Sequence, residues 1–343
     1  MTSQPLVSIV TPVYNEEEYL AECIRSVLTQ TYQNWDYTVL DNQSTDGTAE
    51  VAHRYARKDS RIRVISTDQF LPVIANHNAA LRLISPESKY CKVLFGDDWL
   101  FPECLARMVA VAEEHRSVGI VGAYCLWGTA ARNQVGWTGL PYPSPLVSGR
   151  DICRSRLLNG LSVFGSATSV LFRADLVRGR DPFYNEDNLH SDQETCLALL
   201  KTSDFGFVHQ VLTFTREHPE SISMGLKSYN TCLAGDLYEL ATFGREYLTP
   251  EEYCSCLTRH MAKYYRFLGK RLVTMHDASF WKYHKQALSK AGFSFQWTRL
   301  ALGAAAELAS AALNPKDTLA RLLRRSGSDQ AFHKGIDPAS LGG

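Results

Sequence analysis

The first 125 residues alternate between short apolar runs and longer stretches with helical periodicity. Apolar runs typical of buried strands lie at residues 6–11, 35–40, 61–65, 90–95 and 118–125. Stretches with an apolar face at helical spacing lie between them, at residues 17–30, about 46–58, 76–84 and 102–115. Strands that alternate with helices in this way form parallel βαβ units. We therefore predict an α/β fold in which a mostly parallel central sheet is flanked by helices.

The alternation ends after residue 125. Residues 139–149 are rich in Pro and Gly, which indicates a loop, and residues 150–225 mix helix and strand signals. From about Ser228 the pattern is mostly helical. We predict one domain at 1–225, with halves at 1–125 and 126–225, and a mostly helical C-terminal extension at 226–343. The last ~18 residues are expected to be flexible, as chain ends commonly are.

The charge balance and the cysteine content indicate which partners the protein can have and in which cellular compartment it lies. Lys and Arg number 36 and Asp and Glu number 36, so the basic excess typical of nucleic-acid-binding proteins is absent. The nine cysteines include no CxxC pair, which favours unpaired thiols in a reducing compartment. The N-terminus MTSQPLVSIV lacks the pattern of a signal peptide. We expect a cytoplasmic protein, either free or peripheral on the inner face of the cell membrane, with no nucleic-acid partner.

Polar residues follow three of the predicted strands. They are Thr11, Pro12, Tyr14, Asn15 and Glu16 after the first strand, Asp41 and Asn42 after the second, and Asp97 and Asp98 after the fourth. Loop chemistry alone favours such residues in turns. However, the carboxyl ends of parallel strands meet at one edge of the sheet, where open α/β sheets bind ligands. Three polar turns at that edge predict a ligand crevice.

The adjacent acids Asp97 and Asp98 are the sharpest local feature of this edge. Neighbouring carboxylates repel each other unless water or a cation lies between them. Carboxylate oxygens suit Mg²⁺ or Mn²⁺, ions that commonly bridge a protein to diphosphate oxygens. The alternative is that Asp98 helps to cap the helix that begins near Pro102.

Three blocks of the sequence together resemble family 2 glycosyltransferases of the GT-A fold. They read VSIVTPVYNEEEYLAECIRSVLTQTY, VLDNQSTDGT and FGDDWLFPECL, and their order and separation match the family. The resemblance continues through GSATSVLFRADLV, HSDQETCLALL and VLTFTREHPESIS, which ends at residue 223. The resemblance implies a GT-A catalytic domain.

The resemblance also implies a role for each matching residue. It assigns Thr11, Pro12, Tyr14, Asn15 and Glu16 to the nucleotide block, Asp41 and Asn42 to the nucleotide-binding pair whose second member contacts the base, Asp97 to the sugar or ribose, Asp98 to a Mn²⁺ or Mg²⁺ ion, Asp192 to the catalytic base, and Arg216 and His218 to the diphosphate. Asn42 stands where the family usually has a second acid. Asp192 could instead be the N-cap of a helix at 193–200, and Glu194 is a rival base.

The implied activity is an inverting transfer of a sugar from a nucleoside-diphosphate sugar to an acceptor hydroxyl. A cation would neutralise the departing diphosphate, and one carboxylate would deprotonate the acceptor. A single base with no second nucleophilic carboxylate implies one displacement and an inverted anomeric centre. A UDP or dTDP donor is favoured, with GDP possible. We expect a carbohydrate or lipid-linked acceptor, in the synthesis of surface polysaccharide or glycoconjugate.

Two other functions compete with sugar transfer. A sugar nucleotidylyltransferase would usually carry a Gly-rich, basic stretch after its first strand, where this chain has PVYNEEEY. A non-catalytic nucleotide-sugar-binding or scaffold protein would not need the three acids. Neither GxGxxG nor GxxxxGK[ST] occurs, which argues against dehydrogenases and P-loop proteins.

The end of the helical region has an ambiguous pattern. Residues 297–325 are Ala- and Leu-rich and end in LARLLRR, an amphipathic and basic stretch. Such a segment can lie on an anionic membrane surface. The alternative is a helix that packs on the catalytic domain with a solvated basic face.

Overall fold

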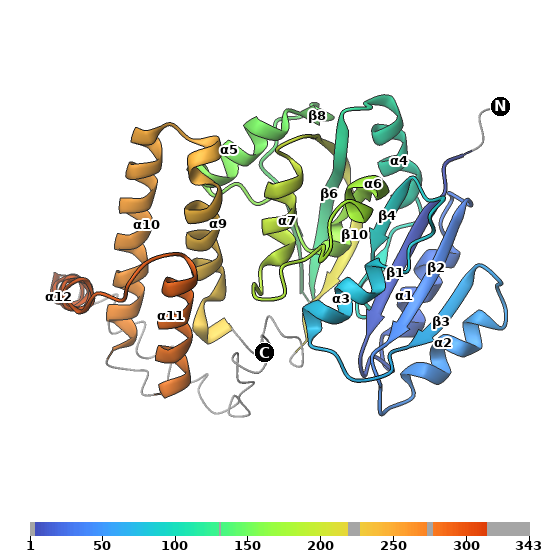
Figure 1. The fold of residues 1–343 in the computed structure, drawn as a ribbon, viewed down its shortest axis with the longest axis horizontal. Helices are drawn as coiled ribbons and strands as arrows, with labels where there is room; N and C mark the ends of the chain where they lie inside the picture. Colours follow the sequence, from blue (N-terminus) through green and yellow to red (C-terminus); the bar gives the residue numbers. More distant parts are fainter. Residues whose placement is uncertain (1–3, 130–131, 219–226, 273–276, 314–343) are drawn as a thin grey trace. The chain divides into compact units, whose positions relative to one another are not determined.

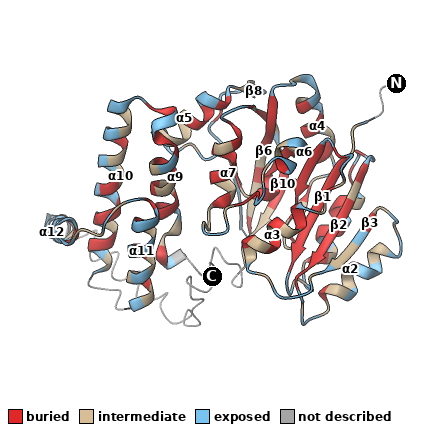
Figure 2. Ribbon diagram, viewed as in Figure 1, coloured by how far each residue is buried: buried red, intermediate tan, exposed pale blue. Residues whose placement is uncertain are grey.

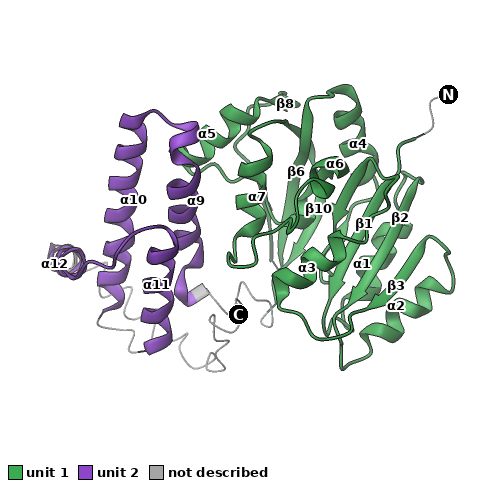
Figure 3. Ribbon diagram, in the orientation of Figure 1, with its two compact units in different colours: residues 1–218 green, residues 219–343 purple. Residues whose placement is uncertain are grey.

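The computed structural model describes residues 4–129, 132–218, 227–272 and 277–313. The chain divides into two compact units, residues 1–218 and residues 219–343 (Figure 3). The predicted domain boundary at 225 and the basic stretch at 319–325 lie outside the described residues, as does the tail expected to be flexible.

The first unit is built on a ten-stranded sheet (Figure 1). Its strands are β1 (Val7–Val13), β2 (Trp35–Asp41), β3 (Ile62–Ser66), β4 (Tyr90–Val93), β5 (Trp99–Leu100), β6 (Val118–Thr129), β7 (Arg132–Gly136), β8 (Leu146–Val147), β9 (Val170–Arg173) and β10 (Asp204–Arg216). The order is β3-β2-β1-β4-β9-β6-β10-β5, with β7 paired to β6 and β8 to β10. β3, β2, β1 and β4 are parallel, whereas β9 runs antiparallel to both neighbours. The sheet is therefore mixed, with a parallel N-terminal half.

Helices cover this sheet because their apolar positions recur at helical spacing. They are α1 (Leu20–Leu28), α2 (Thr48–Ala56), α3 (Val73–Leu81), α4 (Cys104–Glu114), α5 (Gly149–Asn159), α6 (Ala174–Arg178) and α7 (Ser191–Leu199), with a 3₁₀ turn, η1 (Ala167–Ser169). α1 buries Leu20, Cys23, Ile24 and Val27 in the same core cluster as β1 (Figure 2). Each such side chain contributes about 1.5–3 kcal/mol relative to exposure.

The predicted alternation of strands and helices is confirmed, and two local expectations are wrong. β1 continues to Val13, so Thr11 and Pro12 lie within the strand and are buried rather than following it. α4 begins at Cys104 with Glu103 at its cap position, so Asp98 does not cap this helix. The short β5 has only two residues, which is too few for a periodic pattern to be visible in the sequence.

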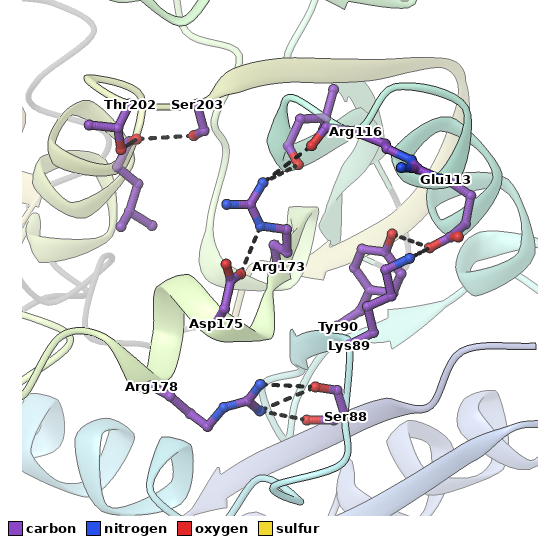
Figure 4. A network of polar contacts seen from close by, with 12 residues as sticks. Ser88, Lys89, Tyr90, Glu113, Arg116, Arg173, Asp175, Arg178, Thr202 and Ser203 are labelled. Atoms are coloured by element: carbon purple, nitrogen blue, oxygen red, sulfur yellow. Dashed lines mark hydrogen bonds and ion pairs between the residues drawn. The ribbon is translucent and has the colours of Figure 1, made fainter.

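A polar network holds β4 and β9 at the N-terminal end of β4, away from the acid pair (Figure 4). The guanidinium of Arg178 donates to the backbone carbonyl of Ser88, at 3.2 Å. Arg173 pairs with Asp175 at 2.7 Å, between Nε and Oδ1. These bonds join α6 to the residues just before β4 and to the end of β9.

The second unit is helical, as predicted for this part of the chain. It contains the 3₁₀ turn η2 (Lys227–Tyr229) and helices α9 (Thr231–Tyr247), α10 (Pro250–Arg271), α11 (Ala278–Lys290) and α12 (Trp297–Leu313). α10 and α12 approach closely because both carry glycine at the contact. A Cβ on Gly303 would lie 2.3 Å from the carbonyl oxygen of Tyr265, and one on Gly269 would lie 2.3 Å from the amide nitrogen of Ala304. Among the described residues, no helix is both long and apolar enough to cross a membrane.

Candidate active site

The loops that follow β1 and β2 are joined by hydrogen bonds at the carboxyl edge of the sheet. Asn15 Oδ1 accepts from the backbone N–H of Thr45 at 2.8 Å, and the N–H of Asn15 donates to Ser44 Oγ at 3.0 Å. The N–H of Glu16 donates to Thr48 Oγ1 at 2.7 Å. Asn15 adopts a left-handed backbone, with φ of 55°, which asparagine tolerates better than most residues. The first two polar turns therefore form one continuous surface, as the topology predicted.

Tyr14 and Thr11 occupy different environments within the first block. The hydroxyl of Thr11 lies 2.9 Å from that of Tyr37 in the interior, so its side chain is part of the core. Tyr14 is 43% exposed, and its ring packs edge-on against that of Phe70 with centroids 4.9 Å apart. Of these two predicted residues, only Tyr14 has a side chain that a ligand could reach.

Asn42 uses its side-chain amide inside the protein. Its Nδ2 donates to the carbonyl of Leu71 at 2.9 Å, and its Oδ1 accepts from the N–H of Leu71, also at 2.9 Å. Asp41 is also buried, and its Oδ1 accepts from the N–H of Ser44 at 3.2 Å. Asn42 therefore orders the loop before α3, a role that the sequence did not predict. Its contact with a base remains a prediction.

The acid pair lies at the end of β4, beside the end of β10. Asp98 is buried, and its Oδ1 accepts from the backbone N–H of Arg216 at 3.0 Å. Burial and the neighbouring charge of Asp97 raise the pKa of Asp98 well above its usual range. Asp97 Oδ2 lies 3.1 Å from Nε2 of His218. The structure thus brings together the acids and both predicted basic residues.

Arg216 is held in place by polar and aromatic contacts. Its Nε donates to the carbonyl of Asp97 at 3.0 Å, and its Nη2 pairs with Glu22 at 2.6 Å. The guanidinium lies over the rings of Tyr19 and Trp99, at 4.5 and 5.1 Å from their centroids. A cation ordered in this way next to the acid pair is suited to an anionic ligand such as a diphosphate.

The same region concentrates negative charge. Glu16 is partly buried, and burial together with the charge of Asp97 raises its pKa to about 8. Within the described part of the chain, no three His, Cys, Asp or Glu side chains form a complete cation site. Mg²⁺ and Mn²⁺ commonly take one or two carboxylates and complete their shell with water and phosphate oxygens. The donor set of Asp97 and Asp98 fits such a shared ion, with Asp98 the more deeply buried of the two.

Asp192 lies in the first turn of α7. Glu194, the other candidate for the catalytic base, has a different role. Asp192 Oδ1 accepts from the N–H of Gln193 at 2.8 Å, and burial raises its pKa while the nearby charge of His190 opposes this. Glu194 accepts from the side-chain amides of Asn185 and Asn188, at 3.0 and 2.8 Å. Glu194 therefore orders the loop before α7. α7 begins at Ser191 with His190 at the cap position, so Asp192 is not its N-cap.

A chain of polar contacts connects the acid pair to the start of α7. Thr215 Oγ1 lies 3.5 Å from Asp98 Oδ2 and 3.4 Å from Ser166 Oγ. The carbonyl of the adjacent Gly165 accepts from Nε2 of Gln193 at 2.5 Å. The segment that contains η1 therefore links the two predicted catalytic elements.

Sequence reasoning missed the residues that hold this segment. Lys92, which is fully buried in β4, donates from Nζ to the carbonyls of Thr168 and Val170 at 2.5 and 3.0 Å. The hydroxyl of Thr168 accepts from the N–H of Phe95 at 3.1 Å and also hydrogen-bonds Asp98. A lysine inside the apolar run YCKVLF was the one available signal, because a buried lysine requires specific partners.

Comparison with known proteins agrees with this arrangement. Residues 8–149, which include the first two polar turns and the acid pair, match the model of glycosyl transferase family 2. This match confirms the resemblance predicted from the three blocks.

Curated relatives have names consistent with this assignment. The putative glycosyltransferase EpsE of Bacillus subtilis is 34% identical over 173 residues, which cover 48% of this chain and 59% of the relative. An uncharacterized glycosyltransferase of Haemophilus influenzae is 28% identical over 194 residues, 54% of this chain and 57% of the relative. The chain thus spans less than two thirds of either relative.

Solved structures share the fold. S. aureus TarS 1–349 in complex with UDP-GlcNAc has a TM-score of 0.59 at 17% identity, over 83% of this chain and 80% of that one. The mannosyltransferase PcManGT from Pyrobaculum calidifontis, in complex with GDP-Man and Mn²⁺, has a TM-score of 0.54 at 17% identity, over 97% of this chain and 82% of that one. The predicted GT-A fold with a helical C-terminal region is confirmed.

Asn42→Asp, which restores the acid usual in the family, is expected to destabilise the protein. A carboxylate cannot donate to the carbonyl of Leu71 and would face it with negative charge, at a cost of about 1–3 kcal/mol. Urea unfolding measures the change. Asn34→Asp is the matched control, because Asn34 makes its bond to Gln4 on the surface and should lose less stability. Equal losses in the two variants would contradict the role assigned to Asn42.

The raised pKa of Glu16 predicts that the metal-free protein loses stability as pH rises. The folded state retains a proton on Glu16 up to about pH 8, whereas the unfolded chain releases it near 4.5. Stability from this group is therefore present below the unfolded pKa and declines as pH increases toward 8. Glu16→Gln should flatten the decline in melting temperature between pH 5 and 9 in EDTA. Glu18→Gln, an exposed neighbour, should melt as the wild type does at each pH.

Proposed function

We propose that this chain is an inverting glycosyltransferase that moves a sugar from a nucleoside-diphosphate sugar to an acceptor hydroxyl. The match of residues 8–149 to the model of glycosyl transferase family 2 supports sugar transfer. One observation supports the mechanism in particular. Polar contacts run from Asp98 through Thr215 to Ser166, and the neighbouring Gly165 is hydrogen-bonded to α7. The acid pair proposed to act on the diphosphate and the proposed base Asp192 are therefore connected through one segment. A direct displacement requires both groups to be held in place around the sugar.

The proposed reaction is a single step. The acceptor oxygen forms a bond to the anomeric carbon while the bond from that carbon to the diphosphate oxygen breaks. The electron pair of the broken bond leaves with the nucleoside diphosphate, and the hydroxyl proton passes to the carboxylate of Asp192. A partly buried carboxylate with a raised pKa is a stronger base than a fully exposed one, which favours this proton transfer.

Residues on the donor side would stabilise the leaving group. Asp98 would hold the cation, which when bound acts as a Lewis acid toward the diphosphate, and Asp97 would contact the sugar or ribose. Arg216 and His218, ordered against Asp97, would add positive charge on the same side. Tyr14, exposed beside Phe70, would contact the nucleoside, with Asn15, Glu16 and Asp41 forming the surrounding loops.

The donor is proposed to be a UDP or dTDP sugar, with a GDP sugar as the other candidate. TarS was solved with UDP-GlcNAc and PcManGT with GDP-Man and Mn²⁺, which supports a nucleotide-sugar donor and a divalent ion without choosing a base. The name of a further relative, a putative teichuronic acid biosynthesis glycosyltransferase of Bacillus subtilis, supports an acceptor in surface polysaccharide synthesis. We propose a carbohydrate or lipid-linked acceptor.

The two competing functions are less well supported. The match to a glycosyltransferase family disfavours nucleotidylyl transfer. A scaffold protein would have no need for the base candidate Asp192 in addition to the acid pair. Pyrophosphate exchange would favour nucleotidylyl transfer, and donor binding without turnover would favour a scaffold protein.

Substitutions of the two key acids should separate binding from chemistry. In the presence of Mn²⁺ and a panel of nucleotide-sugars, Asp192→Asn should bind donor normally and lower kcat by about 10²–10⁴-fold, the usual contribution of a general base. Asp98→Asn should weaken Mn²⁺-dependent binding of nucleoside diphosphate. Release of nucleoside diphosphate and calorimetric titration measure the two effects.

The matched control is Asp151→Asn, which changes an exposed acid in the first turn of α5. It should retain wild-type turnover and donor binding. Normal turnover in the Asp192 variant would exclude Asp192 as the base, and metal-independent donor binding in the wild type would exclude the cation.

Contact with the inner face of the cell membrane is also proposed, through the helices of the second unit. α12 exposes Leu302, Leu308 and Leu313 at 71, 67 and 80%. A helix with an apolar outer face, followed in sequence by LARLLRR, has the composition of a surface-binding segment.

Replacing these three leucines together by serine should reduce binding to phosphatidylglycerol vesicles. The substitution removes apolar area that would otherwise enter the lipid interface, so the protein should float less with vesicles in a density gradient. Leu146→Ser, at another exposed leucine, is the control and should float as the wild type does. Equal flotation of all three proteins would disprove membrane contact through α12.

A further inference from the structure

Phe70 is a large apolar side chain that is exposed at the carboxyl edge of the sheet. It lies in the loop between β3 and α3 and is 57% exposed. Its ring meets that of Tyr14 edge-on, with the ring centroids 4.9 Å apart and the ring planes at 69°. In an edge-on pair each ring keeps at least one face clear of the other. The two exposed rings therefore offer aromatic surface next to the loop that follows β1.

The loop that carries Phe70 is fixed at both ends by residues at the end of β2. At its start, the N–H of Thr67 donates to the carbonyl of Asp41 at 2.9 Å. At its other end, the side chain of Asn42 donates to the carbonyl of Leu71 and accepts from the N–H of Leu71, each at 2.9 Å. Because Phe70 directly precedes Leu71, these two bonds determine where its ring lies.

The side-chain amide of Asn42 is directed into this loop rather than toward a ligand. Asn42 is 2% exposed, and its Oδ1 also accepts from the hydroxyl of Thr67 at 3.3 Å. Proteins tell one base from another by hydrogen bonds to the edges of the base, whereas stacking uses the ring face that every base has. Asn42 therefore supports the loop instead of reading the edge of a base, and the side chains of Tyr14 and Phe70 provide ring faces.

We propose that Phe70 contacts the base of the donor and that Asn42 is the positioning residue for its ring. The base is then bound by stacking, so that pyrimidine and purine nucleoside diphosphates bind with similar affinity. The inference rests on the proposed function and adds how the base of the donor is recognised. Stacking on an aromatic side chain tolerates every base, and a base that covers Phe70 removes its exposed apolar surface from water. Discrimination between donors is therefore left to their sugars.

Calorimetric titration of the full chain in Mn²⁺ with UDP, dTDP, GDP and ADP tests this inference, with inorganic pyrophosphate as a probe that has no base. The nucleotides should bind the wild type within about tenfold of one another, and more tightly than pyrophosphate. Phe70→Ala should weaken every nucleotide by about fivefold or more, the usual effect of losing one stacking side chain. The same variant should leave pyrophosphate binding unchanged. Phe70→Tyr, which keeps an aromatic face, should bind the nucleotides as the wild type does.

Trp297→Ala is the matched control, because it removes an aromatic side chain of comparable exposure, 67%, from the second unit and should leave every affinity unchanged. A preference of the wild type for one base by more than about tenfold, or unchanged nucleotide binding in Phe70→Ala, would overturn the inference. Weaker pyrophosphate binding in Phe70→Ala would also overturn it, because Phe70 would then support the fold or the diphosphate site. Failure of the wild type to bind any of the nucleotides would instead contradict the proposed function.

Discussion

Burial of the Asp98 carboxylate is the constraint on which the site depends. A carboxylate removed from water must be compensated by donors or a cation. The donors come from β10, through the backbone of Arg216, and from η1, through the hydroxyl of Thr168. Lys92 also donates to the carbonyls of Thr168 in η1 and Val170 at the start of β9. The end of β4 is therefore joined to two segments that are more than seventy residues away in the chain.

The two halves of the sheet make different contributions. The parallel strands β3, β2, β1 and β4 place their loops at one edge, where Asn15, Glu16 and Asp98 lie. β9 inserts antiparallel between β4 and β6, and the turn η1 directly precedes it. The polar network of Arg173 and Arg178 lies at the other end of β9 and joins it, through α6, to the residues before β4. The loops after β1, β2 and β4 and the turn η1 are thus supported by different parts of one sheet.

Much of the fold could be predicted from the sequence because its parallel half has strong periodicity. The strands at 35–40 and 90–95 and the helix at 102–115 differ from β2, β4 and α4 by only a few residues at their ends. Strands without a periodic signal could not be predicted, such as β5 with two residues. The residues of the candidate site were predicted because they match the motifs of the family. Their partners, including Glu22, Thr168 and Thr215, had no local signal because each acts through contact with a distant segment.

The sequence by itself determined the class of fold and the residues with reactive side chains, because hydrophobic periodicity and motif spacing are properties of the linear chain. Only the tertiary structure decided how those side chains are used. Asn42 is bonded to Leu71, Glu194 to Asn185, and Thr11 packs against Tyr37. The physical reason is that hydrogen bonds and burial depend on which groups meet in space. Two carboxylates that look alike in HSDQETC, those of Asp192 and Glu194, therefore acquire different surroundings only after the chain has folded.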